Sequence, residues 1–279
     1  MTWWCVTLTE PWAWSPKAYP GIWASVLLLL VPYLVSMRRR TGANPHAGRR
    51  VAAFVGGVAV YWLATDWPLG TLGAGYLASA HMVQFLLYTL GAAPLILLGI
   101  PEWMGRRVLG RLRAYRAVRL LTKPLIAGVA YNVILLATHA PATVDTFRSS
   151  ELGSFALDAA WLLGGLLLWM PILSPLPELQ ARSYFNKMIY LFLAAQVIPM
   201  IPGGILTFAD FPLYSTYELA PRTFGLEARS DQALAGALMK VGGLPVVWGT
   251  MFGLMIRWAR SEGHVDDRER RRRAAAAQG

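Results

Sequence analysis

The chain has 279 residues, of which 56% are hydrophobic and 15% are charged, and its formal net charge is +11. A chain that is both strongly apolar and charged usually places its apolar blocks in lipid and its charges in the loops between them. This composition leaves no room for a large water-soluble domain. It also makes a nucleic-acid-binding surface the weaker explanation of the positive charge, because that charge is divided among separate loops and a tail.

Seven apolar blocks follow one another along the chain, and we interpret each as a membrane-spanning helix: residues 21–37, 51–66, 76–99, 124–140, 154–173, 188–208 and 231–258. The third block is free of Lys, Arg, Asp and Glu up to residue 101, which is long enough to cross a ~30 Å hydrocarbon core. The predicted fold class is therefore all-α: a polytopic membrane protein built as a bundle of seven transmembrane helices.

Most of the 26 Lys and Arg residues lie in four stretches, 38–50, 106–123, 182–187 and 257–273. These stretches alternate with loops that hold few cations, so the positive-inside rule predicts an external N-terminus and a cytoplasmic C-terminus. We expect the basic stretch at 106–123 to contact anionic lipid headgroups or an acidic partner.

The chain divides on this basis into three parts, which are an external Trp- and Pro-rich segment (1–20), a transmembrane domain (21–258) and a basic cytoplasmic tail (259–279). Four Trp residues in the first part favour a flap that lies on the bilayer surface, since Trp prefers the membrane interface. Its Cys5 is the single cysteine of the chain and cannot form an internal disulfide. We interpret Cys5 as an inert thiol, with an auxiliary copper ligand as the alternative.

Polar side chains recur at one depth, near the external ends of the blocks. His81 lies near the start of the third block together with Met82 and Gln84, His139 ends the fourth block, and Asp158 lies one turn into the fifth. Because consecutive spans run in opposite directions, these groups share a depth. An imidazole inside a span is expected to face protein, water or a metal ion.

Asp66, at the outer end of the second block, is either a solvated helix end or a further member of this layer. The sixth block carries Gln196 just before a Pro- and Gly-rich break at 199–204, which frees backbone carbonyls. Asp210 lies in the loop that follows, and Ser230, Asp231 and Gln232 form an N-cap signal for the last block. Lys240 lies inside that block and is expected to reach outward to Asp158, Asp210 or Asp231.

Three functions compete on residue chemistry. The first is a metal site that suits copper or zinc; its candidate ligands are His81, His139, Met82, Asp158, Asp66 and Asp210. The second, a retinal protein with a Schiff base on Lys240, lacks an anionic counterion in the middle of the third span. The third is a non-catalytic membrane subunit whose polar interior fixes helix packing. No nucleophile is paired with a base, so we expect no catalytic residues and no enzyme activity.

Several stretches resemble the CtaG-type cytochrome c oxidase assembly proteins of bacteria: YLASAHMVQFLLYTLGAAPLILLGIP, the ATHAP end of the fourth block, LDAAWLLGGLLLWMPILSP, LAAQVIPMIPGGILTFADFPLYSTY and DQALAGALMKVGGL. The resemblance implies seven spans and a role in building the oxidase copper centre. His81, Met82, Gln84 and His139 match the family pattern, and Asp158 takes the place of a Glu. Phe85 and Ala159 stand where histidines are expected, and Lys240 stands where an apolar residue is expected.

The resemblance and the residues together predict a multi-pass protein of the bacterial inner membrane that acts as a metallochaperone for a haem-copper oxidase of the respiratory chain. Copper would be handled at the external face between the third, fourth and fifth spans. The expected partners are oxidase subunits or copper-delivery proteins and membrane lipids, with no nucleic acid; a homo-oligomer is left open. The alternative is an accessory subunit of a respiratory oxidase complex that binds no metal.

Overall fold

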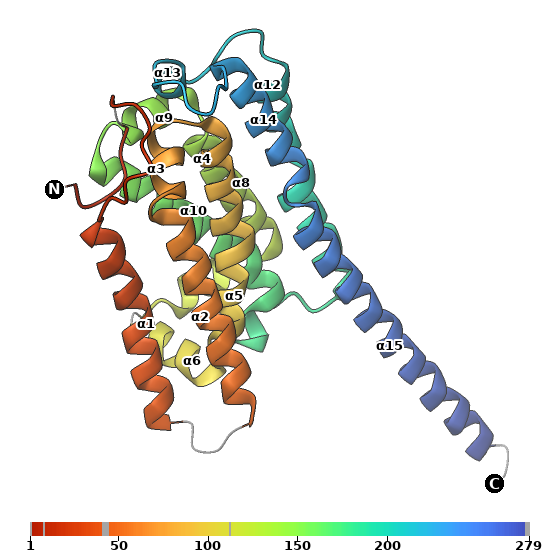
Figure 1. Ribbon diagram of the computed structural model, residues 1–279. Coiled ribbons are helices and arrows are strands. Elements are labelled where there is room, and N and C mark those ends of the chain that lie inside the picture. Colours follow the sequence, from red (N-terminus) through yellow and green to blue (C-terminus); the bar gives the residue numbers. More distant parts are fainter. Residues whose placement is uncertain (1, 8, 41–44, 112, 277–279) are drawn as a thin grey trace.

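The computed structural model describes residues 2–7, 9–40, 45–111 and 113–276. Within these ranges the protein contains no strand, and 77% of it is helix. The all-α prediction is confirmed, and Figure 1 shows the helices gathered in one bundle with the last helix extending away from it.

In chain order the first half consists of α1 (Pro20–Arg40), α2 (Pro45–Thr65), α3 (Leu69–Gly75), α4 (Ala78–Leu86), the π-helical turn η1 (Leu87–Ala92), α5 (Ala93–Gly99), α6 (Glu102–Arg111) and α7 (Tyr115–Leu121). The second half consists of α8 (Pro124–Thr138), α9 (Pro141–Arg148), α10 (Glu151–Leu173), the 3₁₀ turn η2 (Pro177–Leu179), α11 (Tyr184–Phe192), the π-helical turn η3 (Leu193–Val197), α12 (Met200–Phe208), α13 (Ser215–Glu218), α14 (Ala228–Val241) and α15 (Leu244–Ala276).

Five helical segments are long and apolar enough to cross a membrane: Pro20–Arg40, Ala78–Gly99, Glu151–Leu173, Tyr184–Phe208 and Ala228–Ser261. A sixth is added if α7 and α8, which meet at a bend of 82°, form one span. The helix α2 covers the predicted second block but is not among these segments, and its early turns carry Arg49 and Arg50. The described part of the chain therefore contains five or six candidate membrane spans, and the number seven stays a prediction.

The continuous segment α4–η1–α5 lies at the centre of the bundle, and two-thirds of its most apolar stretch is buried. Small residues allow its neighbours to approach closely. A Cβ atom on Gly165 of α10 would lie 2.7 Å from the Thr89 Cα atom, and one on Gly57 of α2 would lie 2.8 Å from the Ile96 backbone nitrogen. Gly165 and Gly57 therefore allow α10 and α2 to pack closely against this central segment.

The sixth predicted block is interrupted where its Pro and Gly residues lie. The helix α11 passes into the π-helical turn η3, and α12 begins after Pro199. Beyond the break α12 packs on α14, where a Cβ atom on Gly236 would lie 2.5 Å from the Gly203 carbonyl oxygen. The Pro and Gly residues therefore both end one helix and allow the next to pack tightly.

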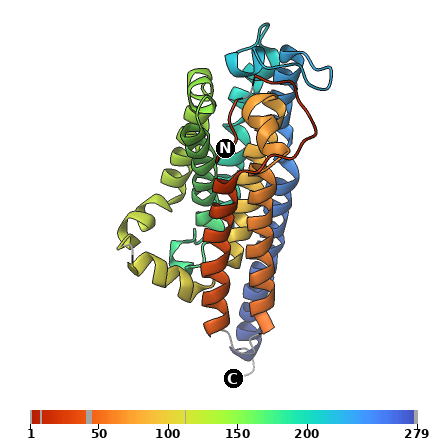
Figure 2. The same ribbon diagram turned by 60° about the vertical axis from the view of Figure 1, so that its left-hand side comes forward.

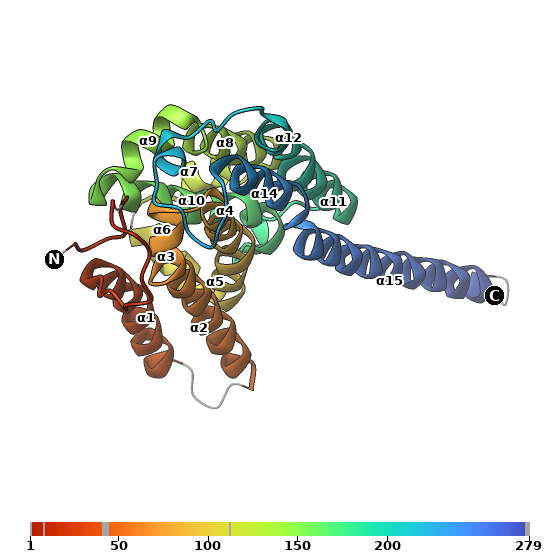
Figure 3. The same cartoon turned by 45° about the horizontal axis from the view of Figure 1, so that its top comes forward.

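The two ends of the bundle differ. The N-terminal segment, α3, α9 and α13 gather at one end, and α6 lies at the other end beside the foot of α1 and α2 (Figures 1 and 2). The C-terminal part of α15 projects away from the other helices, as Figure 3 shows from above. His81 and the N-terminal segment therefore lie at one end, and the basic residues at the end of α1, at the start of α2 and in α6 lie at the other.

Candidate functional site

Two buried histidines form the centre of the site. His81 lies in the first turn of α4, and His139 follows the last residue of α8. Their ring centroids are 5.5 Å apart and their planes are nearly perpendicular, at 83°. The structure therefore brings together the two histidines that the sequence places at one depth.

The hydrogen bonds of the two imidazoles define which nitrogen carries the proton. The Tyr217 hydroxyl donates to the Gly73 carbonyl oxygen at 2.7 Å, so it must accept from Nδ1 of His81, which lies 2.7 Å away. Nδ1 of His139 donates to the Leu135 carbonyl oxygen at 2.8 Å. In the neutral form both rings therefore carry a lone pair on Nε2, and neither Nε2 atom has a hydrogen-bond partner among the residues that the structure describes.

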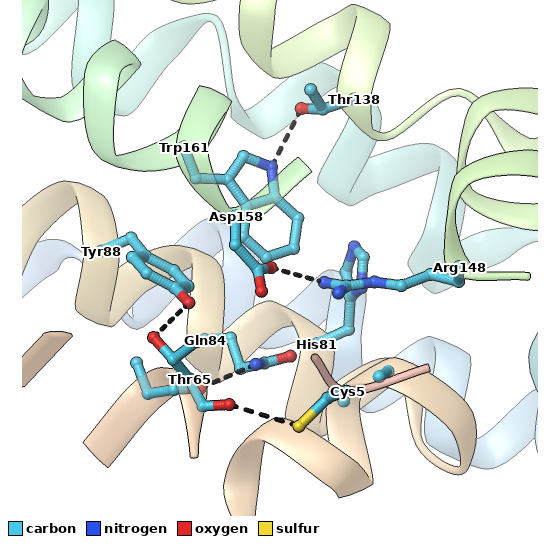
Figure 4. Close-up of polar contacts among 12 residues, drawn as sticks. Cys5, Thr65, His81, Gln84, Tyr88, Thr138, Arg148, Asp158 and Trp161 are labelled. Atoms are coloured by element: carbon cyan, nitrogen blue, oxygen red, sulfur yellow. Dashed lines mark hydrogen bonds and ion pairs between the residues drawn. The ribbon is translucent and has the colours of Figure 1, made fainter. Parts of the chain in front are cut away.

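Aromatic side chains surround the pair. The Trp161 ring lies 4.6 Å from the His81 ring, and the Phe85 ring lies 4.7 Å from the His139 ring. The indole N–H of Trp161 donates to the Thr138 hydroxyl at 3.0 Å, which holds that ring in place (Figure 4). The unpartnered Nε2 atoms thus lie among buried aromatic rings, away from solvent.

A fully buried ion pair lies beside the histidines. Arg148, the last residue of α9, donates to the Asp158 carboxylate at 3.1 Å, and both side chains are essentially inaccessible to solvent. The guanidinium also lies 5.1 Å from the centre of the Trp161 ring, and Figure 4 shows it next to His81. The predicted ligand Asp158 is thus bound to a cation. Arg148, one of the few cations in the loops predicted to be external, is part of the site.

The N-terminal segment contacts this ion pair directly. The indole N–H of Trp4 donates to the second oxygen of Asp158 at 2.8 Å, and the backbone N–H of Thr7 donates to the Arg148 carbonyl oxygen at 3.0 Å. Trp4 and Cys5 are both buried. The expectation that this segment lies on the bilayer surface is wrong for these residues, because the buried Asp158 carboxylate offers the indole a hydrogen-bond acceptor.

Cys5 contacts α2 and α3. Its sulfur donates to the Thr65 carbonyl oxygen at 3.4 Å, and burial raises the pKa of the thiol to about 12. A thiol so held is protonated near neutral pH, whereas metal ligation requires the thiolate.

Asp66 and Gln84 are committed to local contacts. The Asp66 carboxylate accepts from the indole N–H groups of Trp23 and Trp62, at 2.8 and 2.7 Å, and from the Trp67 backbone. The Gln84 amide donates to the Ala64 carbonyl oxygen at 2.7 Å. Asp66 therefore joins the ends of α1 and α2, and Gln84 joins α4 to α2.

Asp231 and Asp210, from the last two predicted blocks and the loop between them, also form contacts away from the two histidines. Asp231 accepts from the backbone N–H groups of Ala78 and Ser79 and from the Ser79 hydroxyl, so it caps α4 rather than its own helix, whose N-cap is Glu227. Asp210 pairs with Arg229 at 3.3 Å on the surface.

Lys240 therefore has none of the carboxylate partners predicted for it. Its ammonium lies 4.9 Å from the centre of the Phe208 ring, and the Gln196 amide donates to its backbone carbonyl oxygen at 2.9 Å. A cation over an aromatic face is an alternative to an ion pair in a water-poor setting.

In the part of the chain that the structure describes, no group of three or more His, Cys, Asp or Glu side chains is arranged to hold a metal ion. Of the predicted ligands, the structure places His81 and His139 together, and Met82 is buried in the surrounding core. A metal would have to be held mainly by the two imidazoles.

The family described as cytochrome c oxidase caa3 assembly factor (Caa3_CtaG) matches this chain over residues 28–261. The chain belongs to this family. No curated protein and no solved structure matches it. The match to the caa3 assembly factors includes both histidines, Arg148 and Asp158, whereas Trp4 and Cys5 lie outside it.

Two positions where the resemblance implies further histidines have other roles here. Phe85 places its ring against His139, and Ala159 is only half-buried on α10. As a member of the caa3 assembly factor family, this chain therefore offers two imidazoles where four are expected.

Proposed function

We propose that this protein assists the assembly of a haem-copper cytochrome c oxidase by handling copper at His81 and His139. The observation that carries the proposal is the pair of buried Nε2 atoms without partners, on two rings whose Nδ1–H groups are already committed. Histidines that bind metals usually donate the other ring N–H to an oxygen acceptor, which fixes the tautomer and the ring orientation. Both rings satisfy this condition.

The donor set favours copper over a hard divalent cation. Imidazole nitrogens suit copper, and a neutral pair in an apolar site stabilises a monovalent ion better than a divalent one, which would need carboxylate or thiolate ligands. Asp158 cannot readily supply that charge because Arg148 and Trp4 occupy its two oxygens. We therefore propose Cu(I) as the cargo, bound for transfer and without catalytic turnover.

We further propose seven spans in the bacterial inner membrane, with the N-terminus outside. The helical segments found in all seven predicted blocks support the count. The basic stretches beside α6 support a cytoplasmic position for that end, which leaves the histidine pair near the external surface. The partners would then be oxidase subunits or copper-delivery proteins outside the cytoplasm.

Copper stoichiometry tests the proposal. Purified protein should hold about one Cu(I) under competition with a chelator, and the His81→Ala/His139→Ala variant should lose it. The matched control is His46→Ala/His264→Ala, which removes the other two histidines of the sequence and should retain the copper. Absence of bound copper in the unmodified protein would reject copper handling, and equal loss in both double variants would reject the assigned site.

A second function is favoured by the ion pair of Arg148 and Asp158. A buried guanidinium beside two imidazoles repels a cation, and an arrangement of this kind suits a scaffold that holds oxidase subunits during assembly without metal. Stable, stoichiometric copurification with oxidase subunits, unchanged in the His81→Ala/His139→Ala variant, would support this accessory role.

A further inference from the structure

A groove opens at the end of the bundle opposite the histidine pair. It has a volume of about 790 Å³ and lies between the start of α2, the ends of α5 and α10, the start of α11 and the side of α15. A volume of this size falls within the ~300–1,000 Å³ range of sites that hold small organic ligands. The apolar part of its wall includes Leu97, Leu98, Ile172, Leu173 and Leu254.

The polar part of the wall carries an excess of positive charge. Four cations line the groove, and these are Arg49, Arg50, Lys187 and Arg257. The carboxylate that accompanies them, Glu102, is already paired with Arg106 at 2.6 Å. None of the ion pairs formed within the described ranges involves the four cations.

The hydrogen bonds of these cations leave their charge uncompensated. Arg50 donates to the Ile100 carbonyl oxygen at 3.1 Å. Lys187, which is buried, donates to the Ile172 carbonyl oxygen at 3.3 Å and to the Gln180 side-chain oxygen at 2.8 Å. All three acceptors are neutral, so none of these hydrogen bonds supplies an opposite charge to the cations of the groove.

The groove also lies at the ends of three apolar segments that, under the proposed function, span the membrane. The apolar segments Ala78–Gly99 and Glu151–Leu173 end beside it, and Tyr184–Phe208 begins there. The cations therefore lie at the level of the lipid headgroups, whereas Leu97 and Leu98 lie at the last turn of a span. Leu98 is 49% exposed and faces outward from the bundle.

We propose that this groove binds one anionic phospholipid, with its phosphate among Arg49, Lys187 and Arg257 and its acyl chains along Leu98 and Leu254. Guanidinium groups bind phosphate oxygens in a bidentate manner, and basic pockets between transmembrane helices suit acidic headgroups. A zwitterionic lipid should bind more weakly, because its own ammonium group would be repelled by the four cations of the groove. A free phosphate leaves the apolar half of the wall in water.

Native mass spectrometry of the full chain in detergent tests the proposal, with phosphatidylglycerol as the probe. The test variant is Arg49→Gln/Arg257→Gln, in which both replaced side chains are exposed and neither forms an ion pair. The matched control is Arg116→Gln/Arg119→Gln, which removes two exposed arginines of α7 outside the groove. Phosphatidylethanolamine and glycerol phosphate are titrated in parallel.

We expect the unmodified protein and the control to bind one phosphatidylglycerol. The test variant should bind it about 25-fold more weakly, since each of its two lost cations contributes about fivefold near a headgroup. Phosphatidylethanolamine should bind weakly, and glycerol phosphate should not compete. Equal affinity in the two double variants would overturn the proposal. Full competition by glycerol phosphate would also overturn it, because the groove would then be a site for an anion only. A dimer that the test variant abolishes would overturn it as well, because the groove would then bind a second copy of the chain.

Discussion

Replacing Arg148 by Met should destabilise the protein by about 3–5 kcal/mol, because it leaves the Asp158 carboxylate charged and buried with the Trp4 indole as its remaining partner. At roughly 2–4 °C of midpoint per kcal/mol, this corresponds to a fall of ~10 °C in the thermal unfolding midpoint of the detergent-solubilised protein. Adding Asp158→Leu should recover most of the loss, since replacing both partners of a buried pair by apolar groups is often neutral.

The chain contains a matched control for this measurement. Arg229 and Asp210 form an Arg–Asp pair of similar length, 3.3 Å against 3.1 Å, but their side chains are 60% and 93% exposed. Replacing Arg229 by Met should cost no more than about 1 kcal/mol, because an exposed pair is screened by water. If Arg148→Met and Arg229→Met lowered the midpoint equally, the burial argument would be refuted.

Four further predictions concern the N-terminal segment and α4. Cys5 should resist alkylation by maleimide at pH 8 in the folded protein and react fully after denaturation, since its thiol has a pKa of about 12; a folded protein that labels readily would contradict this burial. Because folding raises the pKa of this thiol from 9.0, its contribution to stability should be complete below pH ~9 and should be lost as the pH rises toward 12. The thermal unfolding midpoint should therefore fall over this pH range, and the Cys5→Ala variant should lack this part of the fall. Trp4→Phe should lower the free energy of unfolding by about 1–3 kcal/mol, because it removes the hydrogen bond to Asp158. The control is Trp14→Phe, which replaces an exposed indole. Equal thermal unfolding midpoints in the two variants would show that the bond to Asp158 contributes nothing. Asp231→Ala should cost about 1 kcal/mol or more through the loss of the cap on α4, and unchanged amide exchange at Ala78 and Ser79 would argue against it.

Much of the fold could be predicted because apolar block length and loop charge are local properties of a sequence. The same reasoning placed His81 and His139 at one depth in the membrane. The alternating direction of the spans determines the depth of a residue but not which spans lie side by side. Whether two spans at that depth are neighbours depends on tertiary packing. The nearly perpendicular contact of the two rings is therefore a result of the structure.

The features that could not be predicted are side chains that serve a different element from their own. Arg148 ends a short helix of mixed polarity, so its sequence is typical of an external loop, yet its side chain reaches the fifth predicted block. Asp231 carries an N-cap signal for α14 and caps α4. Trp4 belongs to a segment whose composition indicates the membrane interface, yet its side chain is buried. Its indole N–H donates to Asp158, a carboxylate that the sequence predicted as a metal ligand.

The ion pair explains how a buried cation can coexist with the proposed copper pair. Arg148 and His81 both contact the Trp161 ring, so the guanidinium would oppose a metal cation nearby if it were alone. With Asp158 bound to it at 3.1 Å, the pair is neutral overall, and the field at the imidazoles is that of a dipole rather than of a charge. The Trp4 indole supplies a further donor to the same carboxylate, which ties the N-terminal segment to the electrostatics of the histidine site. Displacement of that segment by a partner would therefore alter both access to Asp158 and, through the ion pair, the field at the two imidazoles.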